Sequence, residues 1–137
     1  MAFYTKIGML ILSADARNFL VCEKDPKHVT SDYIMPGGKF DEADEVTCLR
    51  NEIMEELGCE VDAPSLEHVG EYVDVAAGRP DRDVSIALYR GRIIGEPAPR
   101  TEIKALHWIG AADASNLRVS PIIRKKIIPD LVARDIL

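Results

Sequence analysis

The first third of the chain is organised as short apolar segments separated by polar turns. Residues 6–13 and 19–22 are apolar and rich in residues that favour strands, and the polar residues 15–18 between them are typical of a turn. These segments predict a β-hairpin. Residues 33–35 then predict a short buried strand that leads into a glycine-rich loop.

The second half of the chain contains three further segments with the character of strands. Residues 67–75 and 84–92 have this character, and residues 76–83, which contain glycine and proline, predict a hairpin with a long tip between them. Residues 103–109 alternate as a short strand does.

A helix is predicted at the C-terminus. Ser120 and Pro121 are a favourable N-cap and first helical residue. The apolar positions that follow have helical spacing: Ile122, Ile123, Ile127 and Leu131. Pro129 lacks the backbone N–H that a continuous helix needs, so we expect a break or kink there. Strands before and after a central helix, followed by a terminal helix, predict a layered α/β or α+β fold.

The central helix lies within residues 45–57. Its apolar positions fall on one stripe, the pattern of a helix that packs against a core: Val46, Leu49, Ile53 and Leu57. Asp44 is a suitable N-cap, and Gly58 stands where a left-handed residue commonly ends a helix.

The other side of this helix carries Glu45, Glu52, Glu55 and Glu56. Glu52 meets Glu55 and Glu56 at spacings where each pair of like charges costs roughly 0.2–0.5 kcal/mol. The last two also lie in the C-terminal turn, where the helix dipole disfavours anions. A tight acidic cluster of oxygen ligands suits Mg²⁺ or Mn²⁺. The alternative is an acidic helix face exposed to solvent.

The loop before the helix reads Pro36-Gly37-Gly38-Lys39. Gly37 and Gly38 permit positive φ and let the backbone approach a metal or a phosphate without an intervening Cβ. Pro36 stiffens the approach to the loop. The loop and the acidic helix together favour a site for a metal and a phosphate.

This arrangement resembles the Nudix hydrolase signature, G-x5-E-x7-R-E-U-x-E-E-x-G-U, in which U is aliphatic. Residues 52–58 match its second half position by position, Cys59 takes the last U position, and residues 36–39 are similar to the PGGK opening common in that family. The spacing from Gly38 to Glu52 is one residue too short.

Because of this shorter spacing, Asn51 stands where the family has arginine and Ala43 stands where it has the first glutamate. In the family these two side chains form an ion pair that joins the loop to the helix. In this chain the ion pair is either shifted onto Arg50 with Glu42 or Asp44, or absent.

The resemblance implies a mixed β-sheet sandwiched between helices. It also implies Mg²⁺-dependent (or Mn²⁺-dependent) hydrolysis of a phosphoanhydride in a nucleoside diphosphate linked to another group. Candidate substrates are an oxidised purine deoxynucleoside triphosphate, ADP-ribose and a dinucleoside polyphosphate. The rival readings are a catalytically weak or inactive Nudix-fold sensor that binds a nucleotide, and an interaction protein whose acidic helix is only surface.

The same resemblance assigns roles to individual residues. The catalytic candidates are Glu52, Glu55 and Glu56, and the metal ligands are these three side chains with the Gly37 carbonyl. Candidate substrate-binding residues are Gly37, Gly38 and Lys39 of the loop and, from the predicted hairpin tip rather than from the resemblance, Arg79. Arg79 either reaches a substrate phosphate or keeps a hairpin tip soluble.

Some residues outside the signature are further candidates. Many Nudix members have a glutamate before the tryptophan of an E-L-x-W run, where this chain has Ala105. Glu102 is the only carboxylate in residues 101–109. It either approaches the acidic side of the central helix or lies away from it. His107 is either a base at neutral pH or a structural residue. The aromatic candidates for stacking on a base, each of which is alternatively a core residue, are Phe3, Tyr4, Phe40 and Tyr72.

Length and charge narrow the remaining possibilities. The 137 residues predict one domain, 1–137, acting as a monomer or homodimer, and the net charge of −6 argues against binding nucleic acid through a basic surface. The absence of a long apolar run and of a cleavage site near the N-terminus predicts a cytoplasmic protein with no membrane partner. The three cysteines lack metal-ligand spacing and are expected to be packing residues: Cys22, Cys48 and Cys59.

Overall fold

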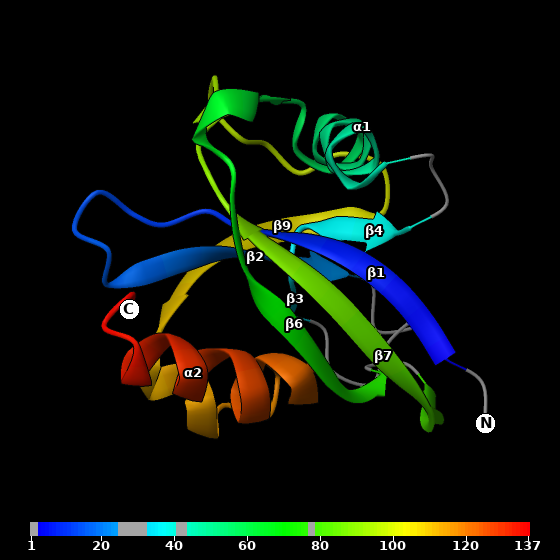
Figure 1. Ribbon diagram of the computed structural model, residues 1–137, viewed down its shortest axis with the longest axis vertical. Helices are drawn as coiled ribbons and strands as arrows, with labels where there is room; N and C mark the ends of the chain where they lie inside the picture. The colour runs from blue at the N-terminus through cyan, green and yellow to red at the C-terminus, as the bar shows by residue number, and fades with distance from the viewer. Residues whose placement is uncertain (1–2, 25–32, 41–43, 77–78) are drawn as a thin grey trace.

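The computed structural model describes residues 3–24, 33–40, 44–76 and 79–137 (Figure 1). The strands are β1 (Phe3–Leu10), β2 (Asn18–Lys24), β3 (Tyr33–Ile34), β4 (Gly37–Lys39), β5 (Glu60–Val61), β6 (Glu67–Ala76), β7 (Arg79–Arg90), β8 (Ile93–Ile94) and β9 (Ile103–Gly110). The helices are α1 (Glu45–Leu57) and α2 (Ile128–Ala133), the short 3₁₀ turns η1 (Ala63–Ser65) and η2 (Ala111–Ser115), and the π-helical segment η3 (Ile123–Ile127).

The strands form a mixed sheet with the order β4-β1-β7-β6 and an antiparallel sheet with the order β3-β2-β9. In the mixed sheet, β1 pairs in parallel with β7. Strand β4 pairs antiparallel with β1, and β6 pairs antiparallel with β7. Figure 1 shows these sheets between α1 on one side and α2 on the other. This architecture confirms the predicted α/β (α+β) fold with a mixed sheet sandwiched between helices.

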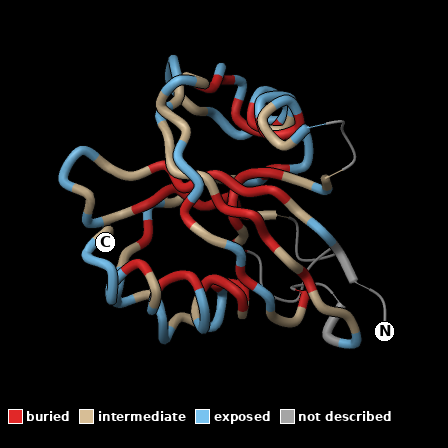
Figure 2. Tube along the Cα trace, in the orientation of Figure 1, coloured by how far each residue is buried: buried red, intermediate tan, exposed pale blue. Residues whose placement is uncertain are grey.

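The core consists of two apolar clusters, one on each side of the sheets. Successive strand residues alternate between them: Met9 and Leu20 contribute to the cluster under α1, and Leu10 and Phe19 to the cluster under α2. Figure 2 shows the buried positions following the strands and the inner sides of the helices. The strands therefore read as nearly continuous apolar runs because both faces of the sheets are covered.

Helix α1 is formed as its sequence predicts. Asp44 Oδ1 accepts a 2.8 Å hydrogen bond from the Thr47 N–H, and Gly58 ends the helix with φ 70°. The apolar stripe is buried at Leu49, Ile53 and Leu57. These contacts fix both the start of the helix and the angle at which its acidic side leaves the core.

The first predicted hairpin is wrong beyond its tip. Leu12 and Phe19 form an isolated antiparallel bridge, and the Leu20 N–H donates to the Ile11 carbonyl at 3.0 Å. Beyond this point β1 and β2 separate into different sheets. The physical reason is that β1 finds a longer partner in β7, with which it pairs from Phe3 to Leu10.

The second predicted hairpin is confirmed, although its strands are longer than predicted. Strand β7 already begins at Arg79, so most of residues 76–83 belong to strands rather than to a long tip. The register is irregular between Val75 and Ala76, where the ladder shifts. Polar strand residues near this end therefore resemble a loop in the sequence.

The C-terminal helical region changes its hydrogen-bonding pattern before Pro129. A π-helical turn at Ile123–Ile127 precedes α2, whose first turn contains Pro129. Ile127 and Ile128 keep helical dihedral angles, so the helical segment continues through Pro129, and the wider π turn lies directly before the residue that lacks a backbone N–H. The expected break thus takes the form of a change from π-helix to α-helix.

Cys22, Cys48 and Cys59 are buried, as predicted for packing residues. Among the described helices, none is long and apolar enough to cross a bilayer.

A hydrogen bond between Tyr72 and Asp130 joins β6 to α2, and it yields a stability prediction. The Tyr72 hydroxyl donates to Asp130 Oδ2 at 2.6 Å, and this bond, together with Arg134, lowers the pKa of Asp130. A carboxylate with a lowered pKa stabilises the fold above its unfolded pKa, and this contribution is lost as the pH falls through the folded value. Tyr72→Phe should cost about 1 kcal/mol at pH 7. In urea denaturation this cost should shrink below about pH 4, and a cost independent of pH would contradict the pairing.

Candidate active site

A pocket with a volume of about 390 Å³ lies where α1, β1, β4 and the start of β9 meet. Its polar lining includes Glu52, Glu55 and Glu56 of α1 and the loop residues Gly37, Gly38 and Lys39. All the predicted catalytic and metal-ligating residues therefore border one cavity, together with three of the four predicted substrate-binding residues.

Glu56 joins the helix to the glycine loop. Its Oε1 accepts a 2.9 Å hydrogen bond from the Gly37 N–H, and the residue is only 7% exposed. Gly37 has φ 140°, and a Cβ at this position would lie 2.0 Å from the Ile7 carbonyl oxygen. Only glycine can therefore hold this loop against β1 while donating to Glu56.

Burial raises the pKa of the Glu56 carboxyl to about 7. The Gly37 N–H and the ammonium groups of Lys24 and Lys6 lower this pKa, whereas the neighbouring charge of Glu52 raises it. The cost of removing the carboxylate from water exceeds the help from its single backbone donor. Positive charge brought into the pocket would favour the ionised form.

Glu52 lies directly against the second glycine of the loop. A Cβ on Gly38 would come within 2.4 Å of the Glu52 carboxyl carbon. Gly38 therefore leaves the space that the Glu52 carboxylate occupies. The two loop glycines have different roles, since Gly37 meets the backbone of β1 and Gly38 meets an acidic side chain.

The three glutamates share the pocket, but not as the tight cluster that the sequence predicts. Glu55 is exposed, Glu52 is half-buried and Glu56 is buried. Across the described ranges, no three Asp, Glu, His or Cys side chains converge as a set of metal ligands. Mg²⁺ commonly takes one or two carboxylates from protein and the rest from water and phosphates. The donors present fit an ion of that kind, completed by a ligand that carries phosphate.

Lys6 and Lys24 also line the pocket, and sequence reasoning did not identify them. Lys6 on β1 is paired in register with Lys39 on β4, and Lys24 ends β2. Burial and then the charge of Lys24 lower the pKa of Lys6, against the opposing effect of Glu56. Lys6 lies within β1 beside its apolar run, and only the strand pairing shows that it stands opposite Lys39.

Glu102 borders the pocket beside Thr101 and Ile103, so it does approach the acidic residues of α1. His107 does not belong to the pocket lining. Its Nε2 lies 2.6 Å from Glu23 Oε1, and its ring stacks on Tyr33 with centroids 4.5 Å apart.

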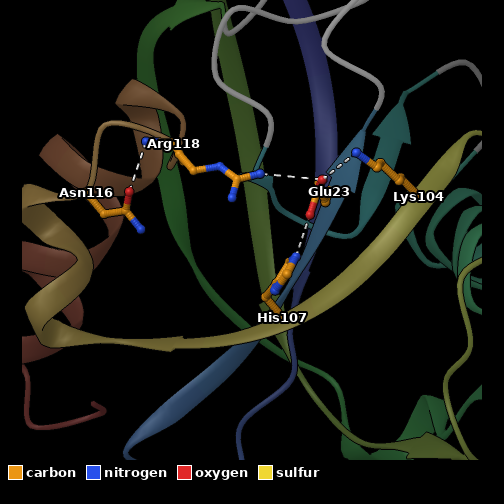
Figure 3. A network of polar contacts seen from close by, with 5 residues as sticks. All are labelled: Glu23, Lys104, His107, Asn116 and Arg118. Carbon is orange, nitrogen blue, oxygen red and sulfur yellow. Dashed lines mark hydrogen bonds and ion pairs between the residues drawn. The ribbon is translucent and has the colours of Figure 1, made fainter.

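Figure 3 shows that the Glu23 carboxylate forms ion pairs with Lys104 and Arg118 in addition to its contact with His107. The His107 hydrogen bond and the two cations lower the pKa of the buried Glu23 carboxyl. These contacts hold β2 and β9 together with the segment before η3. Of its two predicted roles, a base or a structural residue, His107 therefore has the structural one.

The remaining candidates lie away from the pocket or outside the described side chains. Phe40 packs against the cluster under α1, and Tyr72 is buried under α2. The side chains of Phe3, Tyr4 and Arg79 lie outside the described residues.

The altered ion pair is resolved in part. Asp44 caps α1 through the Thr47 N–H and hydroxyl, at 2.8 Å and 2.7 Å. Arg50 is exposed on the helix, and the alternative partner Glu42 lies outside the described residues. In the described part of the chain, the links between loop and helix include the Gly37–Glu56 hydrogen bond and a weaker one from the Cys48 thiol to the Lys39 carbonyl at 3.3 Å.

A family model described as the NUDIX domain matches residues 4–131. The chain belongs to the Nudix family. Membership supports hydrolase activity of the Nudix type. A comparison with curated protein sequences gives no match.

Solved structures with the same Nudix fold cover almost the whole chain. The ORF135 protein of E. coli has a TM-score of 0.73 at 19% identity over 98% of this chain and 92% of that protein. The MutT protein of Methanosarcina mazei Go1 has a TM-score of 0.76 at 13% identity over 96% and 95%. A Nudix hydrolase of Nitrosomonas europaea has a TM-score of 0.68 at 17% identity over 99% and 96%. At these identities the likeness concerns the fold.

The two glycines of the Nudix loop give a paired prediction. Gly37→Ala should destabilise the fold by about 2 kcal/mol or more, because the new Cβ meets the β1 backbone at positive φ. Gly38→Ala should leave the unfolding midpoint nearly unchanged but displace the Glu52 carboxylate and weaken Mn²⁺ binding. Thermal melts and calorimetric titration with Mn²⁺ measure both effects. Equal Mn²⁺ affinity of Gly38→Ala and the wild type would contradict the role given to Glu52.

Proposed function

We propose that this chain hydrolyses a phosphoanhydride bond in a nucleoside diphosphate linked to another group, with Mg²⁺ or Mn²⁺ as the cofactor. The observation that carries this proposal is the composition of one pocket. Carboxylates of α1 and the glycine loop share its lining with the ammonium groups of Lys6, Lys24 and Lys39. A ligand that brings both phosphates and divalent cations matches both signs of charge.

The chemical difficulty is the attack of water on a phosphorus atom surrounded by anionic oxygens. A divalent ion, when bound, supplies charge that neutralises those oxygens. The lysines add point charges that hold the phosphates in place, and the loop glycines let the phosphates approach the backbone. One of the three glutamates accepts a proton from the attacking water.

We assign the metal ligands to Glu52, Glu55, Glu56 and the Gly37 carbonyl, as the family resemblance implies. The phosphate contacts are assigned to Gly37, Gly38, Lys39 and Arg79, to which the pocket adds Lys6 and Lys24. The nucleoside would lie against the apolar part of the pocket, which is lined by Met35, Ile86 and Ile122. The enzyme would act on soluble nucleotides in the cytoplasm as a monomer or homodimer, with no nucleic-acid or membrane partner.

A panel of nucleotides tests the activity. The panel contains oxidised and ordinary purine deoxynucleoside triphosphates, ADP-ribose and dinucleoside polyphosphates, each with and without Mg²⁺. Release of pyrophosphate, phosphate or nucleoside monophosphate is scored for each compound. We expect release from at least one nucleoside diphosphate derivative, dependent on the divalent ion. Failure of every compound with every ion would overturn the proposal.

Glu56→Gln tests the role of the carboxylates. This change keeps a side chain of similar shape and removes the charge, so turnover should fall roughly 100-fold or more. Glu60→Gln is the matched control, because Glu60 is exposed just beyond α1 and outside this pocket. Arg79→Ala should lower turnover far less than Glu56→Gln. Wild-type turnover of Glu56→Gln at saturating Mg²⁺ would defeat the assignment.

A second function is favoured by a separate observation. The chain has Asn51 and Ala43 where the Nudix signature has an ion pair, and its glutamates do not converge as ready-made ligands. These features suit a Nudix-fold sensor that binds a nucleotide without cleaving it. Calorimetry would show nucleotide binding in either case. Binding without turnover under any divalent ion would select the sensor.

A further inference from the structure

The segment that enters β9 lies across the C-terminal end of α1. The last four carbonyls of an α-helix have no partner within the helix. In α1 these belong to Met54, Glu55, Glu56 and Leu57, the turn that carries two of the acidic pocket residues. Residues 98–101, about forty positions further along the chain, provide partners for all four.

The contacts come in order along this segment. The Ala98 N–H donates to the Leu57 carbonyl at 3.1 Å, and the Arg100 N–H donates to the Glu56 carbonyl at 3.0 Å. The Thr101 hydroxyl donates to the Glu55 carbonyl at 3.1 Å. Arg100 Nη1 lies 3.4 Å from the Met54 carbonyl, which also accepts the Gly58 N–H at 3.0 Å. We call residues 98–101 the clamp.

Arg100 brings positive charge to this helix end. Helix α1 has no basic residue in its last turn, so its own sequence does not offset the dipole there. The Arg100 side chain lies over Gly58, where a Cβ would be 2.9 Å from Arg100 Cδ. Gly58 thus serves both the left-handed turn and the approach of the clamp.

Thr101 holds an unfavourable backbone conformation in the clamp. Its φ is 57°, a left-handed value that β-branched residues rarely adopt. The Ile103 N–H donates to the Arg100 carbonyl at 3.0 Å, which closes a turn around Thr101. The turn directs the chain into the pocket, where Thr101, Glu102 and Ile103 form part of the lining. Backbone strain of this kind persists only where surrounding contacts impose it.

We propose that Arg100 and Thr101 are positioning residues. They fix the last turn of α1 against residues 101–103, which line the other side of the pocket, and so set the spacing of the acidic side chains. This inference rests on the proposed function for its purpose, but the contacts are independent of any substrate. The clamp ties Glu55 and Glu56, through their carbonyls, to the residues beside Glu102. Loss of the clamp should let the two walls of the pocket move relative to each other.

The test compares Thr101→Val with Thr101→Ser. Valine keeps the branched shape and loses the hydroxyl, whereas serine keeps the hydroxyl that reaches the Glu55 carbonyl. Mn²⁺ binding without nucleotide is measured by calorimetry, and thermal melts report the stability of each variant. Thr101→Val should bind Mn²⁺ about tenfold more weakly, the smaller end of the effect of losing a residue that orients metal ligands. Thr101→Ser should bind as the wild type does.

A second pair tests the cation. Arg100→Ala should weaken Mn²⁺ binding and Arg100→Lys should restore part of it, whereas Arg92→Ala should change nothing. Arg92 is an exposed arginine paired with Asp62 away from the pocket. The result that overturns the proposal is equal Mn²⁺ affinity in Thr101→Val, Thr101→Ser and the wild type, or a wild type that binds no Mn²⁺. Hydrolysis by the wild type is scored separately, so a failure of the proposed activity is distinguished from a failure of the clamp.

Discussion

The hydrogen bond from the Gly37 N–H to the buried Glu56 carboxylate is the contact on which the site depends. It joins a loop fixed to β1 by strand pairing to a helix fixed by its apolar stripe. A buried carboxylate is tolerated only when it is paired with a partner or becomes neutral by taking up a proton. The chain therefore accepts an unfavourable carboxylate at the point where the loop and the helix meet.

The surroundings of Glu56 show how this cost is offset. Lys6 and Lys24 approach from two different strands, and their charges favour the ionised carboxylate. Burial, and after it the charge of Lys24, lowers the pKa of Lys6. Anions and cations held close together in one pocket suit a ligand that is itself a polyanion accompanied by cations. The clamp, residues 98–101, holds the last turn of α1, and with it Glu55 and Glu56, in place beside the pocket.

The parts of the site that the sequence predicts are those encoded locally. The start and end of α1 follow from Asp44 and Gly58, its buried side follows from the spacing of Leu49 and Ile53, and the glycine pair predicts close backbone approach. Each of these signals lies within one element and needs no knowledge of its neighbours. The resemblance to the Nudix signature then placed the glutamates correctly beside the loop.

The remaining features depend on pairing between distant segments. Lys6 and Lys24 reach the pocket through the register of β1 with β4 and the end of β2, which no local pattern encodes. The predicted hairpin of β1 and β2 was wrong because the parallel partner of β1 lies some eighty residues away. The sequence left His107 as a possible base, because its hydrogen-bond partner Glu23 is distant in the chain.

Paramagnetic broadening by Mn²⁺ tests whether a divalent ion binds between the glycine loop and the acidic side of α1. Trace Mn²⁺ is added to isotopically labelled protein, and the amide signals that broaden first are assigned to residues. We expect the amide signals of Gly37, Gly38 and the turn that contains Glu52, Glu55 and Glu56 to broaden before those of the rest of the chain. Broadening that begins elsewhere, such as around the exposed carboxylates Glu67 and Glu71 of β6, would contradict it.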